Sequence, residues 1–387
     1  MKIISVVGAR PNFMKIAPFI KEINHYNQSH QEQISHILVH TGQHYDDRMS
    51  KAFFEALEIP EADINLGIGS GTHAEQVGHT MIAFEKVLKE EKPDWVVVLG
   101  DVNATLACSV TAKKEHIKVC HIEAGLRSRD MTMPEEINRL VTDRLSDLLL
   151  TPDTLSIENL KQEGVSEKRM AFVGNIMIDT LESNREKAAA FSIGQILHDN
   201  LIPDQRISLD IESPQDNLPF PFAVVTLHRP SNVDTKEVLE PLMRFLLDEV
   251  TKDMYIIWPI HPRTQKQLKS FHLYDEIAKH PKIILQYPLG YHELLRLNMD
   301  AKVMLTDSGG LQEECTILGT PCLTLRWNTE RPITLREHGG ASVLVGNNVD
   351  RIRKEYLVIL QSNTQPIRPE LWDGATAARC LTSILTY

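Results

Sequence analysis

The sequence is poor in cysteine and has no excess of positive charge. It contains 5 cysteines in 387 residues and no C-x-x-C pair, so neither a disulfide framework nor a cysteine zinc site is indicated. The strand-end histidines His228 and His261 have no H-x-x-x-H partner of the kind found in a zinc-binding helix, and we expect no metal ion. The net charge of −11 argues against nucleic acid or anionic lipid as the main partner.

Long apolar runs are also missing. None approaches the roughly 20 residues that a helix needs to cross a bilayer, so we expect no membrane segment. The first residues, MKIISVVGAR, have the pattern of a buried strand and lack the cleavage pattern of a signal peptide. We therefore expect the protein to be cytoplasmic.

What the sequence does contain is an alternation of short apolar runs with helical patterns. Such a repeat predicts parallel sheets covered by helices on both faces, and the length fits two domains of about 150 to 200 residues. We predict an α/β fold of two doubly wound Rossmann-like domains facing a cleft, residues 1–174 and 175–369. A helix over 370–387 is available to pack on the first domain. Residues 190–221 lack clear periodicity and are interpreted as a linker or peripheral insertion.

Polar residues gather directly after the predicted strands of the first domain. In VVGARPNFMK, Arg10 and Lys15 bring positive charge to a helix start, which favours an anion or a sugar oxygen. Asp101 ends the strand in VVVLGD, and Glu123 follows the strand in VCHIE. Ionisable groups at buried strand ends are costly unless they bind each other or a ligand. A solvated turn at Arg10 and a helix cap at Asp101 remain open as alternatives.

The segment PEEINR has the pattern of a helix start. Pro134 suits the first turn, and Glu135 is favourable near the positive end of the helix dipole. Glu135 also lies four residues before Arg139, which predicts an ion pair along the helix. This local explanation accounts for the three residues without a ligand.

The second domain repeats the pattern of polar strand ends. His228 and His261 each follow an apolar run, and neither has metal-ligand spacing with another residue. In LTDSGGLQEE, Gly309 and Gly310 would let an anion approach the backbone N–H groups of a helix start closely. The segment therefore predicts a phosphate site.

Together, these segments resemble the non-hydrolysing UDP-N-acetylglucosamine 2-epimerases. The matching segments run in family order from Gly8 to Pro332: GARPNFMKIAP, TGQHYDDRM, GDVNATLA, HIEAGLRS, PEEINR, FVGNIMIDTL, TLHRPSN, LTDSGGLQEE, LGTPCLTLR and TERP. The resemblance implies a fold like that of the GT-B glycosyltransferases, a homodimer, and a nucleotide in the interdomain cleft. The ligand it implies is a UDP-linked N-acetylhexosamine, with UDP-GlcNAc and UDP-ManNAc interconverted. It implies no cofactor, neither NAD nor a metal.

The resemblance also implies roles for individual residues. UDP would be eliminated to leave a 2-acetamidoglucal and then added back, with the C2 proton returned to the other face. The implied catalytic residues are Asp101, Glu123, Glu135 and His228. We assign the proton steps to Asp101 and Glu123 and positioning to Glu135. The implied substrate-binding residues are Arg10, Lys15, Arg139, Leu289, Leu294, Ser308, Gly309, Gly310, Glu314 and Arg331. Among them, Ser308 to Gly310 would bind the diphosphate and Glu314 the ribose. Leu289 and Leu294 would lie near the uracil.

Several alternatives stay open. An epimerase of another UDP-linked 2-acetamido sugar, a GT-B glycosyltransferase, a hydrolysing 2-epimerase and a non-catalytic nucleotide-sugar sensor would share parts of the pattern. The match is incomplete at the family's allosteric site, where HRPSN stands in place of HRRE. Only Gln43 and His44 of that site remain, which argues against allosteric activation by the substrate.

Overall fold

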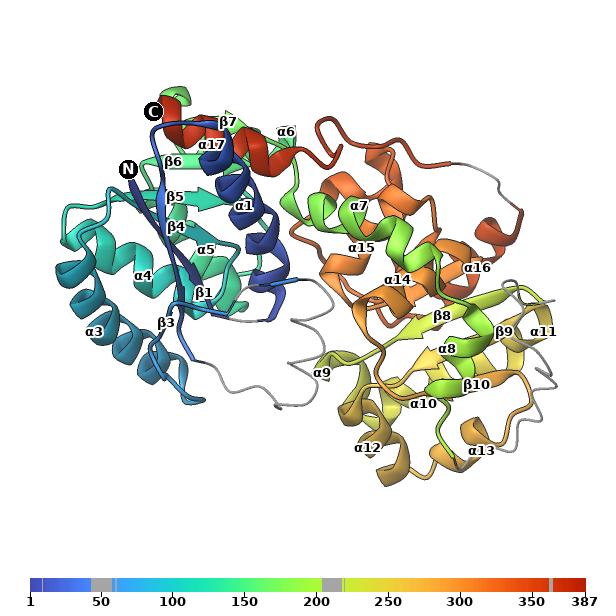
Figure 1. Cartoon of the computed structure of the whole chain (residues 1–387). Coiled ribbons are helices and arrows are strands. Elements are labelled where there is room, and N and C mark those ends of the chain that lie inside the picture. Colours follow the sequence, from blue (N-terminus) through green and yellow to red (C-terminus); the bar gives the residue numbers. More distant parts are fainter. Residues whose placement is uncertain (9, 43–57, 60, 204–217, 219, 362–364) are drawn as a thin grey trace. The chain divides into compact units, whose positions relative to one another are not determined.

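The computed structural model describes residues 1–8, 10–42, 58–59, 61–203, 218, 220–361 and 365–387. Gln43 and His44 lie outside these ranges. The chain divides into two compact units, each built on one parallel sheet with helices around it (Figure 1). Unit 1 comprises Met1–Ser183 and Pro369–Tyr387, and unit 2 comprises Asn184–Arg368.

The sheet of unit 1 has seven strands in the order β3-β2-β1-β4-β5-β6-β7, and all its pairs are parallel. Its strands are β1 (Lys2–Val7), β2 (Ser35–His40), β3 (Ile64–Asn65), β4 (Trp95–Leu99), β5 (Lys118–Ile122), β6 (Leu148–Thr151) and β7 (Met170–Phe172). Every residue of β4 is buried, as a continuous apolar run covered on both faces requires. The order reverses between β1 and β4, which is the topological switch point of a doubly wound sheet.

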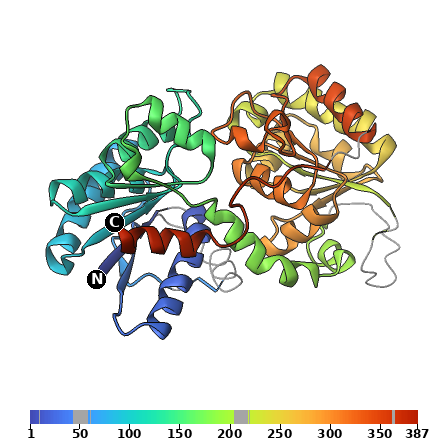
Figure 2. The same cartoon turned by 90° about the horizontal axis from the view of Figure 1, so that it is seen from above.

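The helices of unit 1 follow the strands in alternation. They are α1 (Arg10–Ser29), α3 (His73–Glu91), α4 (Asn103–Lys114), α5 (Pro134–Leu145), α6 (Thr154–Gln162), the first part of α7 (Ile176–Ala189) and α17 (Thr376–Thr386). Helix α3 begins with a capping box, in which Thr72 and Glu75 exchange hydrogen bonds. The C-terminal helix α17 packs beside α1, as Figures 1 and 2 both show.

The division between the units falls after Ser183, within α7, rather than after residue 174 as predicted. Side chains from the first half of α7 bind unit 1. Asp179 accepts hydrogen bonds from the amides of Thr376 and Ala377 at 3.0 and 2.7 Å, and Thr180 donates to the carbonyl of Met14 at 2.6 Å. These bonds fix the start of α7 and the start of α17 to the first sheet's helical layer.

The sheet of unit 2 has six parallel strands in the order β10-β9-β8-β11-β12-β13. The strands are β8 (Phe222–Thr226), β9 (Tyr255–Pro259), β10 (Ile283–Gln286), β11 (Val303–Thr306), β12 (Cys322–Thr324) and β13 (Ser342–Leu344). The helices are α8 (Ile193–Asp199), α9 (Pro230–Val233), α10 (Lys236–Phe245), α11 (Thr251–Asp253), α12 (Pro262–Ser270), α13 (Tyr274–Ala278), α14 (Tyr291–Asp300), α15 (Gly309–Leu318) and α16 (Val349–Gln361). Here the order reverses between β8 and β11. The prediction of an α/β fold with two doubly wound domains is confirmed.

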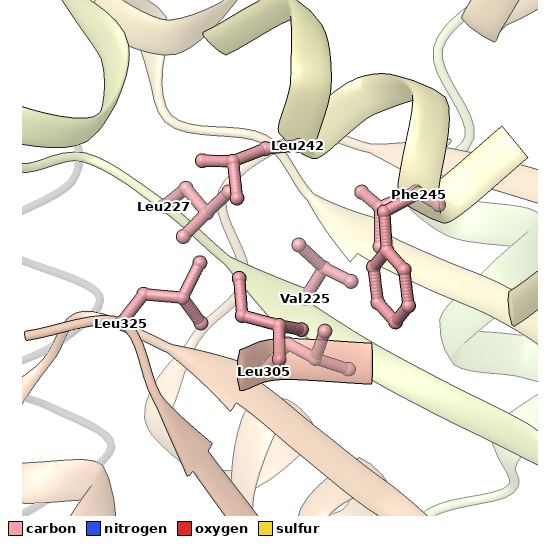
Figure 3. Close-up of a pocket in the computed structure, with 8 residues that line it drawn as sticks. Val225, Leu227, Leu242, Phe245, Leu305 and Leu325 are labelled. Atoms are coloured by element: carbon pink, nitrogen blue, oxygen red, sulfur yellow. The ribbon is translucent and has the colours of Figure 1, made fainter. Parts of the chain in front are cut away.

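A small apolar cavity of about 10 Å³ lies between α10 and the sheet of unit 2 (Figure 3). Leu227, Leu242, Phe245 and Leu305 are among its lining residues, which are all apolar. A cavity with no polar partner for water stays dry, so it is a local packing defect.

Within the described ranges, no helix is both long and apolar enough to cross a membrane.

Candidate active site

The functional candidates of unit 1 lie at the carboxyl ends of β1, β4 and β5. Because parallel strands all end at one edge, the loops after these strands meet at the switch point, where ligands bind in such sheets. Gly100 and Asp101 follow β4, and Glu123 follows β5. Lys15 reaches this edge from α1. Arg10 is the first residue of α1, and its side chain lies outside those that the structure describes.

Lys15 and Glu123 form a buried ion pair at this edge. They lie against Gly100, where an added side chain would place its first carbon 3.2 Å from Nζ of Lys15 and 3.2 Å from Oε2 of Glu123. Gly100 has a φ of +62°, and Glu123 itself has a φ of +74°. A left-handed conformation costs a non-glycine residue about 1 to 2 kcal/mol, and such strain concentrates at functional sites. The fold therefore holds Glu123 in a conformation that its sequence alone disfavours.

Asp101 forms an ion pair with Arg139 of α5. Its side chain is 27% exposed, whereas that of Arg139 is buried. Arg139 is also held by Glu136, with 3.0 Å from Nε and 2.6 Å from Nη2 to Oε2. The prediction that Glu135 pairs with Arg139 is therefore wrong. The glutamate that turns inward and binds Arg139 is Glu136, which lies three residues before the arginine and not four.

Glu136 is bound on several sides. Burial opposes its charge, but hydrogen bonds from the amides of Ser128 and Arg129 and from Arg139 lower the pKa of this carboxyl below its usual value. A carboxylate with a lowered pKa is a poor proton donor. Glu135, in contrast, is half-buried on α5, and no ion pair in the described part of the chain joins it to Arg139.

A second buried network supports the same loops. The imidazole of His121 lies 2.6 Å from Oδ1 of Asp143 and 2.8 Å from the carbonyl of Gly100. Asp143 also binds Arg127 at 2.7 Å and accepts from the amide of Gly125 at 3.0 Å. Asp143 thus ties the loop after β5 to the residue that precedes Asp101. The sequence prediction missed it, since an acid in the middle of a polar helix carries no signal of burial.

In unit 2 the loops after β8 and β11 are joined by Asp307. This fully buried carboxylate accepts hydrogen bonds from the amides of His228 and Arg229 at 3.0 and 2.9 Å and from Nδ2 of Asn232 at 3.1 Å. Nδ1 of His228 lies 2.9 Å from the same group, and the His228 side chain is 44% exposed. Despite its burial, the pKa of Asp307 is lowered by His228 and by these amides. Asp307 was also missed, although it lies inside the quoted LTDSGG segment.

The predicted phosphate segment begins α15. Gly309 and Gly310 are its first two residues, and Ser308 does not cap it with its side chain. The first N–H groups of a helix have no acceptor within the helix, so they remain available to an anion. Arg331 lies next to this helix start, with Nε donating to Glu313 at 2.7 Å.

A family model described as UDP-N-acetylglucosamine 2-epimerase matches residues 27–385. The chain belongs to this family. The resemblance predicted from the motifs is thereby confirmed.

Relatives of the 2-epimerase family match the chain over nearly its full length. It is 40% identical to the UDP-N-acetylglucosamine 2-epimerase of Methanocaldococcus jannaschii, with 100% of this chain and 99% of that protein covered. It is 38% identical to the UDP-2,3-diacetamido-2,3-dideoxy-D-glucuronate 2-epimerase of Pseudomonas aeruginosa, with 91% and 90% covered. The structure of the M. jannaschii enzyme in complex with UDP-GlcNAc and UDP matches with a TM-score of 0.84, at 40% identity and full coverage of both chains. A lipopolysaccharide outer core galactosyltransferase, at 14% identity, 100% and 99% coverage and a TM-score of 0.53, shares the fold alone.

Three further residues that the resemblance to the epimerases had singled out lie near the start of α14 and on α15: Glu314 from the LTDSGGLQEE motif, and Leu289 and Leu294 by alignment back from Ser308. Glu314 is buried, and burial together with the charge of Glu313 raises its pKa to about 8. Tyr291 and Asn298 of α14 are its polar neighbours. Leu289 and Leu294 are half-buried and pack on the apolar cluster between the helices and the sheet of unit 2. The structure thus brings Glu314 to α14, but it gives Leu289 and Leu294 an ordinary packing role.

The residues present in the two sites offer little to a metal. Among the described residues, no group of three or more His, Cys, Asp or Glu side chains is arranged to hold a metal ion. The five cysteines are all buried and free, and burial raises the pKa of Cys108 and Cys380 above the range of a reactive thiol. The ionisable side chains described above at the strand ends of the two units are carboxylates, imidazole, lysine and arginine.

Proposed function

We propose that this chain is a non-hydrolysing 2-epimerase that interconverts UDP-GlcNAc and UDP-ManNAc. The observation that carries the proposal is its full-length likeness to relatives named UDP-N-acetylglucosamine 2-epimerase, combined with two acid–cation pairs at the switch point of unit 1. In the reaction, the C2–H bond and the bond from C1 to the UDP oxygen break. Addition of UDP to the resulting 2-acetamidoglucal, with a proton delivered to the other face of C2, gives the epimer.

The proton steps fall to Asp101 and Glu123. Both follow neighbouring strands, and each is paired with a cation, Arg139 or Lys15, that fixes its position. The exposed part of Asp101 gives it access to a ligand. Glu135 keeps a positioning role, now without Arg139 as its partner.

UDP binding falls to unit 2. The amides at Ser308, Gly309 and Gly310 suit a diphosphate, because they belong to an uncapped helix start. Glu314 suits the ribose hydroxyls, since a protonated carboxyl group can accept a hydrogen bond from one member of a vicinal diol and donate one to the other. Leu289 and Leu294 would flank the uracil.

His228 and Arg331 complete the proposed site. The imidazole of His228 is held by Asp307 on one side and is exposed on the other, so it can donate to the leaving diphosphate. Arg331 lies beside the first residue of α15, next to the same anion. Arg10 would contribute a further positive charge from the start of α1.

We also propose that the enzyme works in the cytoplasm as a homodimer and provides a sugar nucleotide for polysaccharide biosynthesis. This part rests on the likeness to the family. A monomer in light scattering at working concentration would contradict the dimer.

A second candidate substrate is another UDP-linked 2-acetamido sugar. It is favoured by the P. aeruginosa relative, whose name specifies a UDP-2,3-diacetamido-2,3-dideoxy-glucuronate and whose identity to this chain is nearly as high, at 38%. Both substrates carry the acetamido group at C2, so the same elimination and addition would serve either.

The test is incubation of the purified chain with UDP-GlcNAc alone, followed by proton and phosphorus NMR. We expect UDP-ManNAc to accumulate to an equilibrium while the diphosphate signals stay those of a nucleotide sugar. Net release of UDP with free ManNAc would instead show a hydrolysing enzyme. If UDP-GlcNAc is unchanged but the diacetamido glucuronate is epimerised in a parallel sample, the second candidate is correct. If UDP-sugars are converted only after an acceptor is added, the result would favour a glycosyltransferase.

A further inference from the structure

Two arginines and two glutamates are buried together beside α15. Nη2 of Arg326 donates to Oε2 of Glu330 at 2.6 Å, and Nη1 of Arg331 contacts the other oxygen of the same carboxylate. Arg331 is held from its other side by Glu313, with 2.7 Å between Nε and Oε1. Glu330 therefore lies between the two guanidinium groups and fixes both. These four residues, Glu313, Arg326, Glu330 and Arg331, are called the arginine–glutamate cluster below.

The cluster lies directly against the first residue of α15. A side chain at Gly309 would place its first carbon 3.0 Å from Oε1 of Glu330 and 3.4 Å from Nη1 of Arg326. Glycine at this position is therefore what allows the two guanidinium groups to come so close to the helix start. The amides of this first turn have no acceptor within α15, and the Ser308 side chain does not cap them.

One donor of the cluster has no partner. Arg326 is 4% exposed, and its Nε has no hydrogen-bond partner within the described structure. Its other two nitrogens are occupied by Glu330, at 2.6 and 3.4 Å. A buried donor without an acceptor is rare and costs free energy, which a bound ligand or ion that accepts its hydrogen bond would recover. Nε of Arg326 and the first amides of α15 thus both lack an acceptor, and Nη1 of the same guanidinium group lies beside Gly309 at the start of α15.

The charges of the cluster support a diphosphate as this anion. Two guanidinium groups and two carboxylates cancel formally, so the cluster can be buried without a ligand. The helix dipole and the unpaired donors then supply the attraction for an added anion. We infer that Arg326 is a further diphosphate-binding residue, which donates its Nε–H to a phosphate oxygen at the N-terminus of α15. The inference rests on the proposed binding of UDP by unit 2.

The test compares UDP with uridine, which lacks the phosphates. Arg326→Met removes the donor, and UDP should bind about tenfold more weakly or worse, as expected for loss of one hydrogen bond between charged groups. Uridine affinity, measured by ligand-observed NMR, should stay within about twofold, because the nucleoside does not reach Arg326. Arg326→Lys keeps a cation for Glu330 but lacks the Nε donor, so it should also weaken UDP selectively. This second variant carries the test if the methionine variant does not fold.

Arg336→Met is the matched control. Arg336 pairs with Glu355 at 3.0 Å and lines a surface groove together with Gly319, which follows the far end of α15. The variant loses the same charge from the same unit, and UDP affinity should not change. The inference is wrong if an Arg326 variant binds UDP as tightly as the wild type. It is also wrong if UDP and uridine weaken equally, which would indicate a structural role.

The failure of this inference is distinct from failure of the proposed function. A wild-type chain that binds UDP but does not epimerise any UDP-sugar would overturn the proposed reaction and leave the Arg326 comparison valid. An Arg326 variant with normal UDP affinity would overturn only the inference, since turnover of the wild type does not depend on it.

Discussion

Replacing Glu314 by glutamine tests the charge state of a buried acid in unit 2. Burial and the neighbouring charge of Glu313 raise the pKa of Glu314 from 4.5 to about 8. Between these two values the folded protein keeps a proton that the unfolded chain has released. Stability must therefore fall as the pH rises through this interval, at about 1.4 kcal/mol per pH unit.

Glutamine has the shape of the protonated acid but does not titrate. Near pH 5 the wild type and Glu314→Gln should thus differ little, whereas near pH 8 the variant should be the more stable. Integrated over the interval, the stability difference between variant and wild type should grow by about 3.5 kcal/mol from pH 5 to pH 8. The sign is the reverse of that for an acid with a lowered pKa, whose contribution is lost on acidification.

Native-state hydrogen exchange can measure this difference in each unit separately. Amides of β11 report the opening of unit 2, and amides of β4, in unit 1, serve as an internal reference that should not respond to the substitution. Exchange rates would be corrected for their intrinsic pH dependence. If the stability difference at β11 changes by less than about 0.5 kcal/mol between pH 5 and pH 8, Glu314 is not held protonated and the reasoning is refuted.

Three further substitutions test the packing around the two sites. Gly100→Ala should destabilise unit 1 by about 1 to 2 kcal/mol, because Gly100 has a positive φ. The added methyl group should also displace the Lys15–Glu123 pair and so slow turnover. A variant with wild-type stability and turnover would contradict both expectations. Asp307→Asn should cost about 1.5 to 3 kcal/mol in urea unfolding, since the buried carboxylate that accepts from the amides of His228 and Arg229 loses its charge, and an unchanged unfolding midpoint would show that Asp307 does not hold this loop. Leu242→Ala, which enlarges the apolar cavity of Figure 3, should cost about 2 to 5 kcal/mol, whereas an unchanged melting temperature would mean that the helix collapses onto the space.

The strands and the loops that carry the candidate residues could be predicted from the sequence. Parallel strands buried on both faces are continuous apolar runs, as in Trp95–Leu99, and the chain must place polar residues where such runs end. Asp101 and Glu123 were found in this way. Their partners were harder to predict, because pairing depends on which face of a neighbouring helix turns inward.

Helix α5 illustrates the difficulty. Residues three and four positions apart both lie beside Arg139 on a helix, so Glu136 and Glu135 were equally good partners by spacing alone. Because α5 packs against the sheet, Glu136 and not Glu135 turns inward and binds Arg139. The same packing buries Asp143, although nothing in the local sequence indicates that this residue is buried. The boundary of the units at Ser183 was missed for a similar reason, since α7 continues through it without a Pro or Gly.

Isotope exchange at C2 tests the central claim most directly. Wild-type protein and the Glu123→Gln variant would be incubated with UDP-GlcNAc in D₂O, and the C2 position of recovered substrate and product followed by NMR. Elimination and addition predict deuterium at C2 of UDP-ManNAc and of recycled UDP-GlcNAc, with exchange strongly slowed in the variant. A manno product that retains its original C2 proton would contradict removal of that proton, and a variant that exchanges at the wild-type rate would remove Glu123 from the chemistry.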